Sequence, residues 1–236
     1  MKIYSEAMAN ANDILLKRRR KNPKEIPLSK MPTWVEEFPN VFKKGMTFQQ
    51  IGDGSFSTAW LASNGKVYIA TNEKNDMSKR ILSDLNEKLG PQPNLPIIRY
   101  IGTTTMYGKD NPFSVYESEL YRVGDADFWL EHPKQKQYLQ CLLRMPEHTF
   151  FATFAEPSIS NAYGMLESCF AHDLIDYEEQ MDDWEDIVDS MKTLIDFANE
   201  YYPNISDFGK DVSIKNVALD AENKFILLDI FVAVPE

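Results

Sequence analysis

Hydrophobic residues in the first half of the chain come in short runs separated by turn residues, a pattern typical of β-strands. The segment 51–62 has two glycines between β-rich flanks, and Asn64-Gly65 is a strong hairpin signal before a returning strand at 66–71. Further strands are predicted at 97–101 and 113–116. This half of the chain is therefore predicted to be rich in β-structure.

A helical period of apolar residues appears in two places. In the segment 76–89 the residues Ile81, Leu82, Leu85 and Leu89 lie on one face, and Gly90-Pro91 ends the helix. A longer apolar stripe runs from Trp184 to Tyr201 and stops at Pro203. Segments 12–21 and 147–179 indicate further helices, so the second half is predicted to be mainly helical.

Composition allows one substantial core or two small lobes, since the chain has 236 residues and is 43% hydrophobic. Its two cysteines, Cys141 and Cys169, have no Cys-x-x-Cys spacing, and its three histidines are not clustered. This argues against a structural zinc site and fits a reduced, cytoplasmic setting. The start of the chain lacks a signal-peptide pattern and no apolar run approaches 18 residues, so neither secretion nor membrane spanning is indicated.

Charge is distributed unevenly around a net value of −11. A basic cluster near the start contrasts with the segment 145–191, which has twelve acids and neither Lys nor Arg. Such asymmetry can mark opposite interaction surfaces. The basic cluster can contact nucleic acid or an acidic partner, or can form a solvated helix end before Pro23; the acidic segment can face a basic protein or maintain solubility. The cluster consists of Lys17, Arg18, Arg19, Arg20 and Lys21.

Three polar residues of the last quarter have the order and spacing of a phosphoryl-transfer site. Asp211 and Asn216 form an Asp-x4-Asn pattern, in which the aspartate can accept a proton from a hydroxyl while the asparagine helps hold a metal ion. Two apolar runs, 217–219 and 225–228, flank a turn-prone segment and predict a hairpin. Such a hairpin would return Asp229 beside the loop as a second oxygen ligand.

One triplet has the sequence of a kinase metal-binding motif but stands in the wrong place. Asp207-Phe208-Gly209 spells the metal-binding triplet of protein kinases, but it precedes Asp211 instead of following it. Asp229-Ile230-Phe231 is the positional match, although it lacks the glycine.

Together with the glycine turn, this order of motifs resembles the protein-kinase fold from about Phe48 to Phe231. The layout is closest to the compact early protein kinases of podoviruses, and the resemblance implies an α+β, two-lobe fold with a β-rich N-terminal lobe and a truncated helical C-terminal lobe. The expected domains are a helix and irregular lead-in at 1–46, an N-terminal lobe at 47–121 and a C-terminal lobe at 122–236.

The resemblance also implies a role for each matching residue. Gly52, Gly54 and Ser57 would cover the phosphates of ATP, Asp211 would be the catalytic base, and Asn216 and Asp229 would bind Mg²⁺. The segment from Glu117 to Tyr121, with Glu119 and Tyr121 facing the nucleotide, resembles the hinge that receives adenine. Kinship with protein kinases implies serine or threonine hydroxyls of proteins as acceptors, host proteins or the chain itself included.

Departures from the pattern concern the positive charges of the site. The strand after the glycine turn should carry a phosphate-binding lysine, but Ile69 or Thr71 stands there, and Ser78 replaces its glutamate partner. Lys66 and Lys74 are neighbouring lysines that either reach the phosphates or are ordinary surface residues. Gly209-Lys210 replaces the usual His-Arg before the catalytic aspartate, so that only the positive charge of Lys210 remains.

Three functions fit these motifs. The first is a protein kinase of the phage type, which explains all three motifs but not the missing lysine. The second is a small-molecule kinase of the aminoglycoside-phosphotransferase type, although no inserted substrate-binding region is evident. The third is a pseudokinase that acts as an interaction module, a reading favoured by the short stretch after Asp229, which has no room for an activation segment or a peptide-binding platform.

Overall fold

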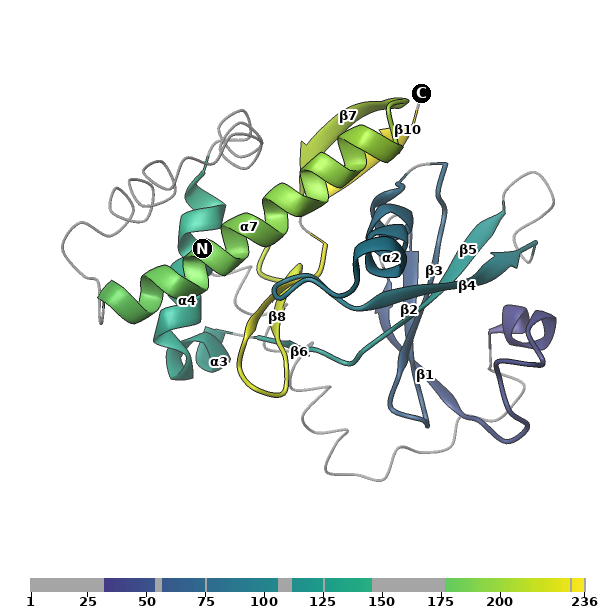
Figure 1. Cartoon of the computed structure of the whole chain (residues 1–236). Helices are drawn as coiled ribbons and strands as arrows, with labels where there is room; N and C mark the ends of the chain where they lie inside the picture. The colour runs from purple at the N-terminus through teal and green to yellow at the C-terminus, as the bar shows by residue number, and fades with distance from the viewer. Residues whose placement is uncertain are drawn as a thin grey trace.

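The computed structural model describes residues 32–53, 57–74, 76–105, 112–124, 126–145, 177–229 and 231–235 (Figure 1). Gly54, the basic cluster at 17–21 and the predicted helix at 12–21 lie outside the described residues. So does the segment 146–176, which holds most of the predicted helical region 147–179 and much of the acidic segment. No helix within the described ranges is both long and apolar enough to cross a membrane.

The first half of the chain forms one antiparallel sheet of five strands, in the order β1-β2-β3-β5-β4. The Asn64-Gly65 turn joins β2 to β3, and Gly65 has a φ of 83°, a left-handed conformation that glycine adopts without a Cβ clash. The predicted strands are thereby confirmed, and the last of them continues through Glu117 and Ser118, the first two residues of the predicted hinge segment. The strands are β1 Phe48–Asp53, β2 Ser57–Ala62, β3 Val67–Thr71, β4 Ile98–Thr104 and β5 Phe113–Ser118.

Aromatic side chains fill one face of this sheet. The short helix η2, Thr33–Glu37, places Trp34 against Phe42, with ring centroids 5.5 Å apart, and Phe42 in turn lies 4.9 Å from Tyr68 of β3. Trp34 is fully buried. The last part of the expected lead-in is therefore part of the core of the sheet.

Helix α2, Ser78–Leu89, covers the other face of the sheet, as the period of its apolar residues predicted (Figure 1). Ile81, Leu82 and Leu85 are buried, and Gly90, with a φ of 83°, ends the helix. Leu89 was predicted on the same buried face, but it is 57% exposed. The last turn projects beyond the residues that bury the rest of the stripe.

The second half combines helices with two small sheets. In the first sheet the strand order is β6-β8-β9, and in the second β7 pairs with β10. Helix α7 begins at Tyr177, before the first residue of the predicted stripe, and ends at Tyr201 before Pro203, as expected. The elements are β6 Arg122–Val123, α3 Ala126–Glu131, α4 Pro133–Arg144, α7 Tyr177–Tyr201, β7 Ile205–Lys210, β8 Val217–Leu219, β9 Phe225–Leu227 and β10 Phe231–Pro235.

A continuous core joins the two halves. Leu82 of α2 and Tyr116 of β5 belong to the same buried cluster as Trp184 of α7 and Val217 of β8. Buried Asn94 adds two hydrogen bonds to β9: its Nδ2 donates to the carbonyl of Phe225 (2.8 Å), and its own carbonyl accepts from Leu227 N–H (2.8 Å). The predicted α+β fold, with a β-rich first half and a helical second half, is confirmed.

Candidate active site

A cavity of about 460 Å³ opens between the five-stranded sheet and the β8–β9 hairpin. The sheet contributes Gly52 and Ser57, the stretch after β5 contributes Glu119 and Tyr121 of the predicted hinge, and the segments on either side of the hairpin contribute the predicted metal ligands. Six of the residues singled out in the sequence therefore line one space. They are Gly52, Ser57, Glu119, Tyr121, Asn216 and Asp229.

Apolar side chains form much of the wall on the sheet side. Ile51, Val67 and Ile69 come from β1 and β3, and Ile98 comes from β4. An apolar space with a few polar groups at its ends is the usual form of a small-molecule site. This wall suits the flat face of a nucleotide base.

Asn216 connects the loop after β7 to the segment after β9. Its side-chain Nδ2 donates to the main-chain carbonyl of Asp211 (2.7 Å). Its own main-chain carbonyl accepts hydrogen bonds from Leu228 N–H (2.8 Å) and Asp229 N–H (3.2 Å). The β8–β9 hairpin lies between these partners, so the predicted hairpin does bring Asp229 back to Asn216.

Asp211 lies beside this connection and not in the cavity wall. Its side chain keeps a solvent-exposed surface, but its pKa is raised above the usual value, first by partial desolvation and then by the negative charge of Asp229. The side-chain hydrogen bond with Asn216 and the positive charge of Lys79 act in the opposite direction. A carboxyl with a raised pKa binds a proton more readily, which suits a general base.

The donor set fits a hard divalent cation. Since Nδ2 of Asn216 is engaged by Asp211, Oδ1 is the atom with which this amide can coordinate, and Asp229 adds a carboxylate. Across the described residues no three His, Cys, Asp or Glu side chains cluster as a metal site. Two protein oxygens are nevertheless sufficient for Mg²⁺, which keeps water and phosphate oxygens as its other ligands.

The triplet Asp207-Phe208-Gly209, which has the sequence of the kinase motif, lies in a strand. Asp207, Phe208 and Gly209 belong to β7 and pair with Val234, Ala233 and Val232 of β10. Asp229, and not Asp207, is the residue next to Asn216.

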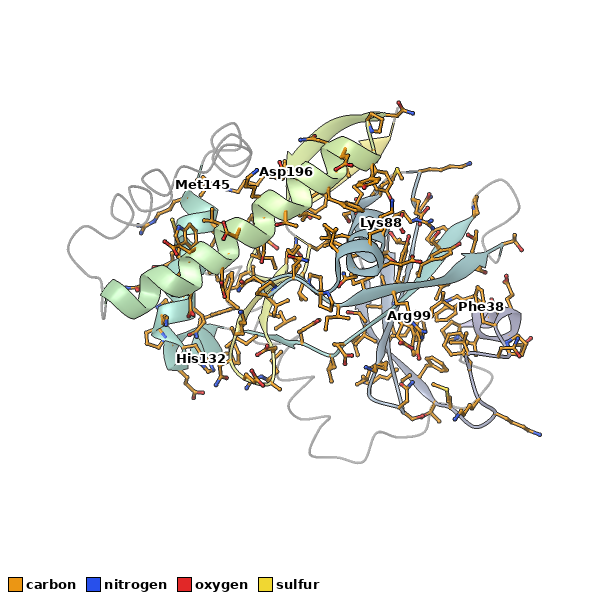
Figure 2. The ribbon with its side chains drawn as sticks, viewed as in Figure 1. Phe38, Lys88, Arg99, His132, Met145 and Asp196 are labelled. Atoms are coloured by element: carbon orange, nitrogen blue, oxygen red, sulfur yellow. The ribbon has the colours of Figure 1, made fainter. Side chains whose placement is uncertain are left out.

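Lys210 does not enter the cavity. Its ammonium donates to the main-chain carbonyl of Met145, which follows the end of α4 (Figure 2). The structure thus gives Lys210 a contact between the end of β7 and the end of α4, and Lys210 is not part of the cavity wall.

The predicted hinge residues have well-defined partners. Glu119 forms an ion pair with Lys66, which directly precedes β3. The hydroxyl of Tyr121 accepts a hydrogen bond from Ile97 N–H (2.8 Å), and burial raises the pKa of this phenol. Lys66 therefore lies at the hinge end of the sheet and not at the phosphate end. Lys74, the other candidate, is not part of the cavity wall.

Sequence reasoning missed a buried lysine on α2. Lys79 is 5% exposed, lines the cavity, and has its Nζ 2.6 Å from Oδ1 of Asp229. The neighbouring Ser78, predicted at the place of the kinase glutamate, donates its hydroxyl to Asp76 (2.8 Å) and lies 3.4 Å from the same Asp229 oxygen. Of the two strand positions at which the resemblance placed a lysine, Ile69 lines the cavity and Thr71 does not. Lys215 was also missed; it lies within the Asp-x4-Asn segment and is an exposed part of the cavity wall.

Comparison with known proteins gives structural similarities alone. No protein family matches the chain, and neither does any curated protein. One similar solved structure is the GDP and kanamycin complex of APH(2″)-IIIa, with 12% identity, a TM-score of 0.39, and coverage of 82% of this chain and 72% of that one. Another is the GDP complex of a mutant aminoglycoside 2′-phosphotransferase-IIIa, with 14% identity, a TM-score of 0.41, and coverage of 85% and 70%. Similarity at this level does not decide the activity, and it gives no support to a viral origin.

Proposed function

We propose that the chain is a phosphotransferase that binds a nucleoside triphosphate with Mg²⁺ and transfers the γ-phosphoryl group to a hydroxyl. The observation that carries the proposal is the position of Asn216. Hydrogen bonds join it to Asp211 on one side and to Asp229 on the other, and Asn216 and Asp229 line the same cavity as Gly52 and Ser57.

The roles of the residues follow from their positions. The base of the nucleotide lies against the apolar wall and the stretch from Glu119 to Tyr121, and the phosphates extend toward Gly52 and Ser57. Backbone N–H groups at a glycine turn can approach phosphate oxygens without a Cβ in the way. Asn216 and Asp229 hold Mg²⁺, which neutralises charge on the phosphate oxygens when bound.

Asp211 acts on the acceptor. Its carboxylate orients the attacking hydroxyl and takes its proton, so that the acceptor oxygen forms the new bond to phosphorus while the nucleoside diphosphate leaves. The raised pKa of Asp211 supports this role, because a carboxylate that holds a proton more firmly is a stronger base.

Two classes of acceptor belong to the proposal. A protein hydroxyl, on a host protein or on the chain itself, follows from the resemblance to protein kinases. A hydroxyl of a small molecule such as an aminoglycoside is the acceptor if the chain is a kinase of the aminoglycoside-phosphotransferase type. That type shares the Asp-x4-Asn pattern and the aspartate at the position of Asp229. Both acceptors need the same base and the same metal ligands.

The test uses γ-labelled ATP, and in parallel γ-labelled GTP, with the full chain and three acceptors: the chain itself, a mixed protein extract and a set of aminoglycosides. We expect label in at least one acceptor with wild type and none with Asp211→Asn, a variant that keeps the size of the side chain. Circular dichroism and binding of unlabelled nucleotide show whether the variant is folded.

Equal labelling by wild type and Asp211→Asn contradicts the role of Asp211. Nucleotide binding without labelling of any acceptor favours the pseudokinase. If the wild type binds no nucleotide in the presence of Mg²⁺, the proposed function is wrong.

A further inference from the structure

Helix α2 brings a positive charge to the cavity at the end where the phosphates are proposed to lie. We propose that Lys79 is the residue that contacts the polyphosphate of the nucleotide, in place of a lysine on strand β3. This inference rests on the proposed function and assigns a site residue that the spacing of the sequence motifs did not reveal.

The environment of Lys79 is unusual for a lysine. The residue is 5% exposed, whereas lysines are almost never buried unless they are paired. Among the described residues, Lys79 forms one ion pair, in which its Nζ lies 2.6 Å from Oδ1 of Asp229. No atom of the described residues accepts a hydrogen bond from Nζ with suitable geometry. An ammonium held by one carboxylate inside a cavity can still donate to oxygens of a ligand.

The position of Lys79 next to Asp229 has a physical reason in the free protein. The Asp229 oxygen that Lys79 contacts also lies 3.4 Å from the hydroxyl of Ser78, which donates to the carboxylate of Asp76 (2.8 Å), so two carboxylates lie near the ammonium. The ammonium thus offsets part of the mutual repulsion of the carboxylates. A metal ion on Asp229 would take over that role, and the long flexible stem of lysine lets the ammonium shift to a phosphate oxygen.

Hydrogen bonds fix the first turn of α2, on which Lys79 stands. The carboxylate of Asp76 accepts from Ser78 N–H (2.9 Å), from the Ser78 hydroxyl (2.8 Å) and from Ala233 N–H (3.2 Å). Met77 N–H donates to the carbonyl of Ala233 (2.9 Å). These bonds tie the start of the helix to β10, the strand that follows Asp229, so the helix start is held close to the residues that contact the phosphates.

The other candidate lysines are less suited. Lys66 is held by Glu119 at the hinge end, and Lys74 does not line the cavity. Lys215 does line the cavity, but it is exposed. An exposed ammonium gains less from a phosphate contact than a buried one, because water screens the interaction.

The test measures binding and needs no turnover. Dissociation constants for Mg-ADP and for adenosine are determined by calorimetry for wild type and Lys79→Met. We expect Lys79→Met to weaken Mg-ADP binding about 10- to 100-fold, the value of one charge-assisted hydrogen bond, while adenosine binding stays unchanged. Unchanged adenosine binding also shows that the cavity is folded; if Lys79→Met loses it, Lys79→Gln, with a polar tip, takes its place.

A second variant moves the charge. Ile69, one of the two positions expected to carry the strand lysine, lines the same cavity from β3. The double variant Ile69→Lys/Lys79→Met should therefore regain much of the preference for Mg-ADP over adenosine. Lys192→Met is the matched control, because Lys192 is a partly exposed lysine of α7 that pairs with Asp196. It should bind both ligands as wild type does.

The inference is overturned if Lys79→Met keeps the wild-type preference for Mg-ADP, or if Lys215→Met loses that preference and Lys79→Met does not. It is also overturned if the double variant does not regain the preference, since the loss would then come from packing and not from charge. In these cases the wild type still binds Mg-ADP, so the proposed function is unaffected. Absence of Mg-ADP binding to wild type overturns both.

Discussion

The main-chain carbonyl of Asn216 accepts a hydrogen bond from the N–H of Asp229, with 3.2 Å between nitrogen and oxygen. The bond closes the loop formed by β8, β9 and the turn between them, so the two proposed metal ligands are held at a fixed separation. A pair of oxygen ligands held in this way needs little rearrangement when a cation binds, and this makes the proposed metal site testable by simple ligand-binding measurements.

Removal of the Asp229 carboxylate should abolish the magnesium-dependent part of nucleotide binding. For wild type, millimolar ATP with Mg²⁺ should raise the melting temperature by several degrees if the nucleotide is far above its dissociation constant. For Asp229→Ala, ATP should give the same small shift with Mg²⁺ as with EDTA. Asp196→Ala, on the exposed side of α7 (Figure 2), is the control and should behave as wild type. A full magnesium-dependent shift in Asp229→Ala would exclude this metal site.

Asp211 should lower the stability of the folded chain at neutral pH. Because its pKa is raised on folding, the native state binds a proton more firmly than the unfolded state, and stability falls as pH rises from the ordinary value of 3.8 through the raised one. Asp211→Asn removes this cost and should be more stable than wild type at pH 7, by less than about 1 kcal/mol since water screens an exposed side chain.

Urea denaturation at several pH values measures this difference. The advantage of Asp211→Asn should disappear below the ordinary aspartate pKa, where the carboxyl is protonated in both the folded and the unfolded state. A variant that is less stable than wild type at pH 7, or an advantage that grows as pH falls, would contradict the raised pKa.

Lys79 and Asp229 should be energetically coupled in the absence of any ligand. Their charged atoms lie 2.6 Å apart and the lysine side chain is 6% exposed, so removal of either charge leaves the other poorly compensated. A double-mutant cycle with Lys79→Met and Asp229→Asn measures this coupling. The double variant should lose less unfolding free energy than the two single variants lose together, by roughly 1–3 kcal/mol.

The matched pair for this cycle is Lys192 and Asp196, with side chains 40% and 56% exposed. Its coupling should be no more than about 0.5 kcal/mol, the usual value for an exposed pair on a helix. Equal coupling in the two cycles would mean that burial does not strengthen the Lys79–Asp229 pair.

Loss of the Asp76 carboxylate should destabilise the chain more than loss of any surface acid. Asp76 is 7% exposed and accepts three hydrogen bonds, from Ser78 N–H, the Ser78 hydroxyl and Ala233 N–H. Asp76→Ala would leave these donors unsatisfied and should lower the free energy of unfolding by roughly 2–3 kcal/mol, against about 0.5 kcal/mol or less for Glu131→Ala on the surface of α3. Equal stability of the two variants in urea denaturation would contradict the role of Asp76 in anchoring α2.

Elements set by short-range signals could be predicted from the sequence. The Asn64-Gly65 turn and its two strands are fixed by a local backbone preference, and Gly65 has the positive φ that this turn requires. The relation of Asp211, Asn216 and Asp229 could also be predicted, because a hairpin of defined length returns the chain to its starting point. In α2 the period identified the buried face, but not the exposure of Leu89 at its end.

Residues whose role depends on the placement of distant elements could not be predicted. Lys79 follows the expected start of α2 by three residues, and no local pattern indicates that its side chain meets Asp229, 150 positions later. In the same way, Lys210 donates to the carbonyl of Met145 because the end of β7 lies next to the end of α4, and this is a feature of the tertiary structure. The sequence by itself determined the strands of the five-stranded sheet, the β8–β9 hairpin, helices α2 and α7 and the acidic loop, since these follow from backbone preferences and hydrophobic period over a few residues. It did not predict β6, β7, β10, α3 or α4. The tertiary structure alone decided which positive charge faces the acids, because that depends on how the sheet, α2 and the hairpin pack around one core.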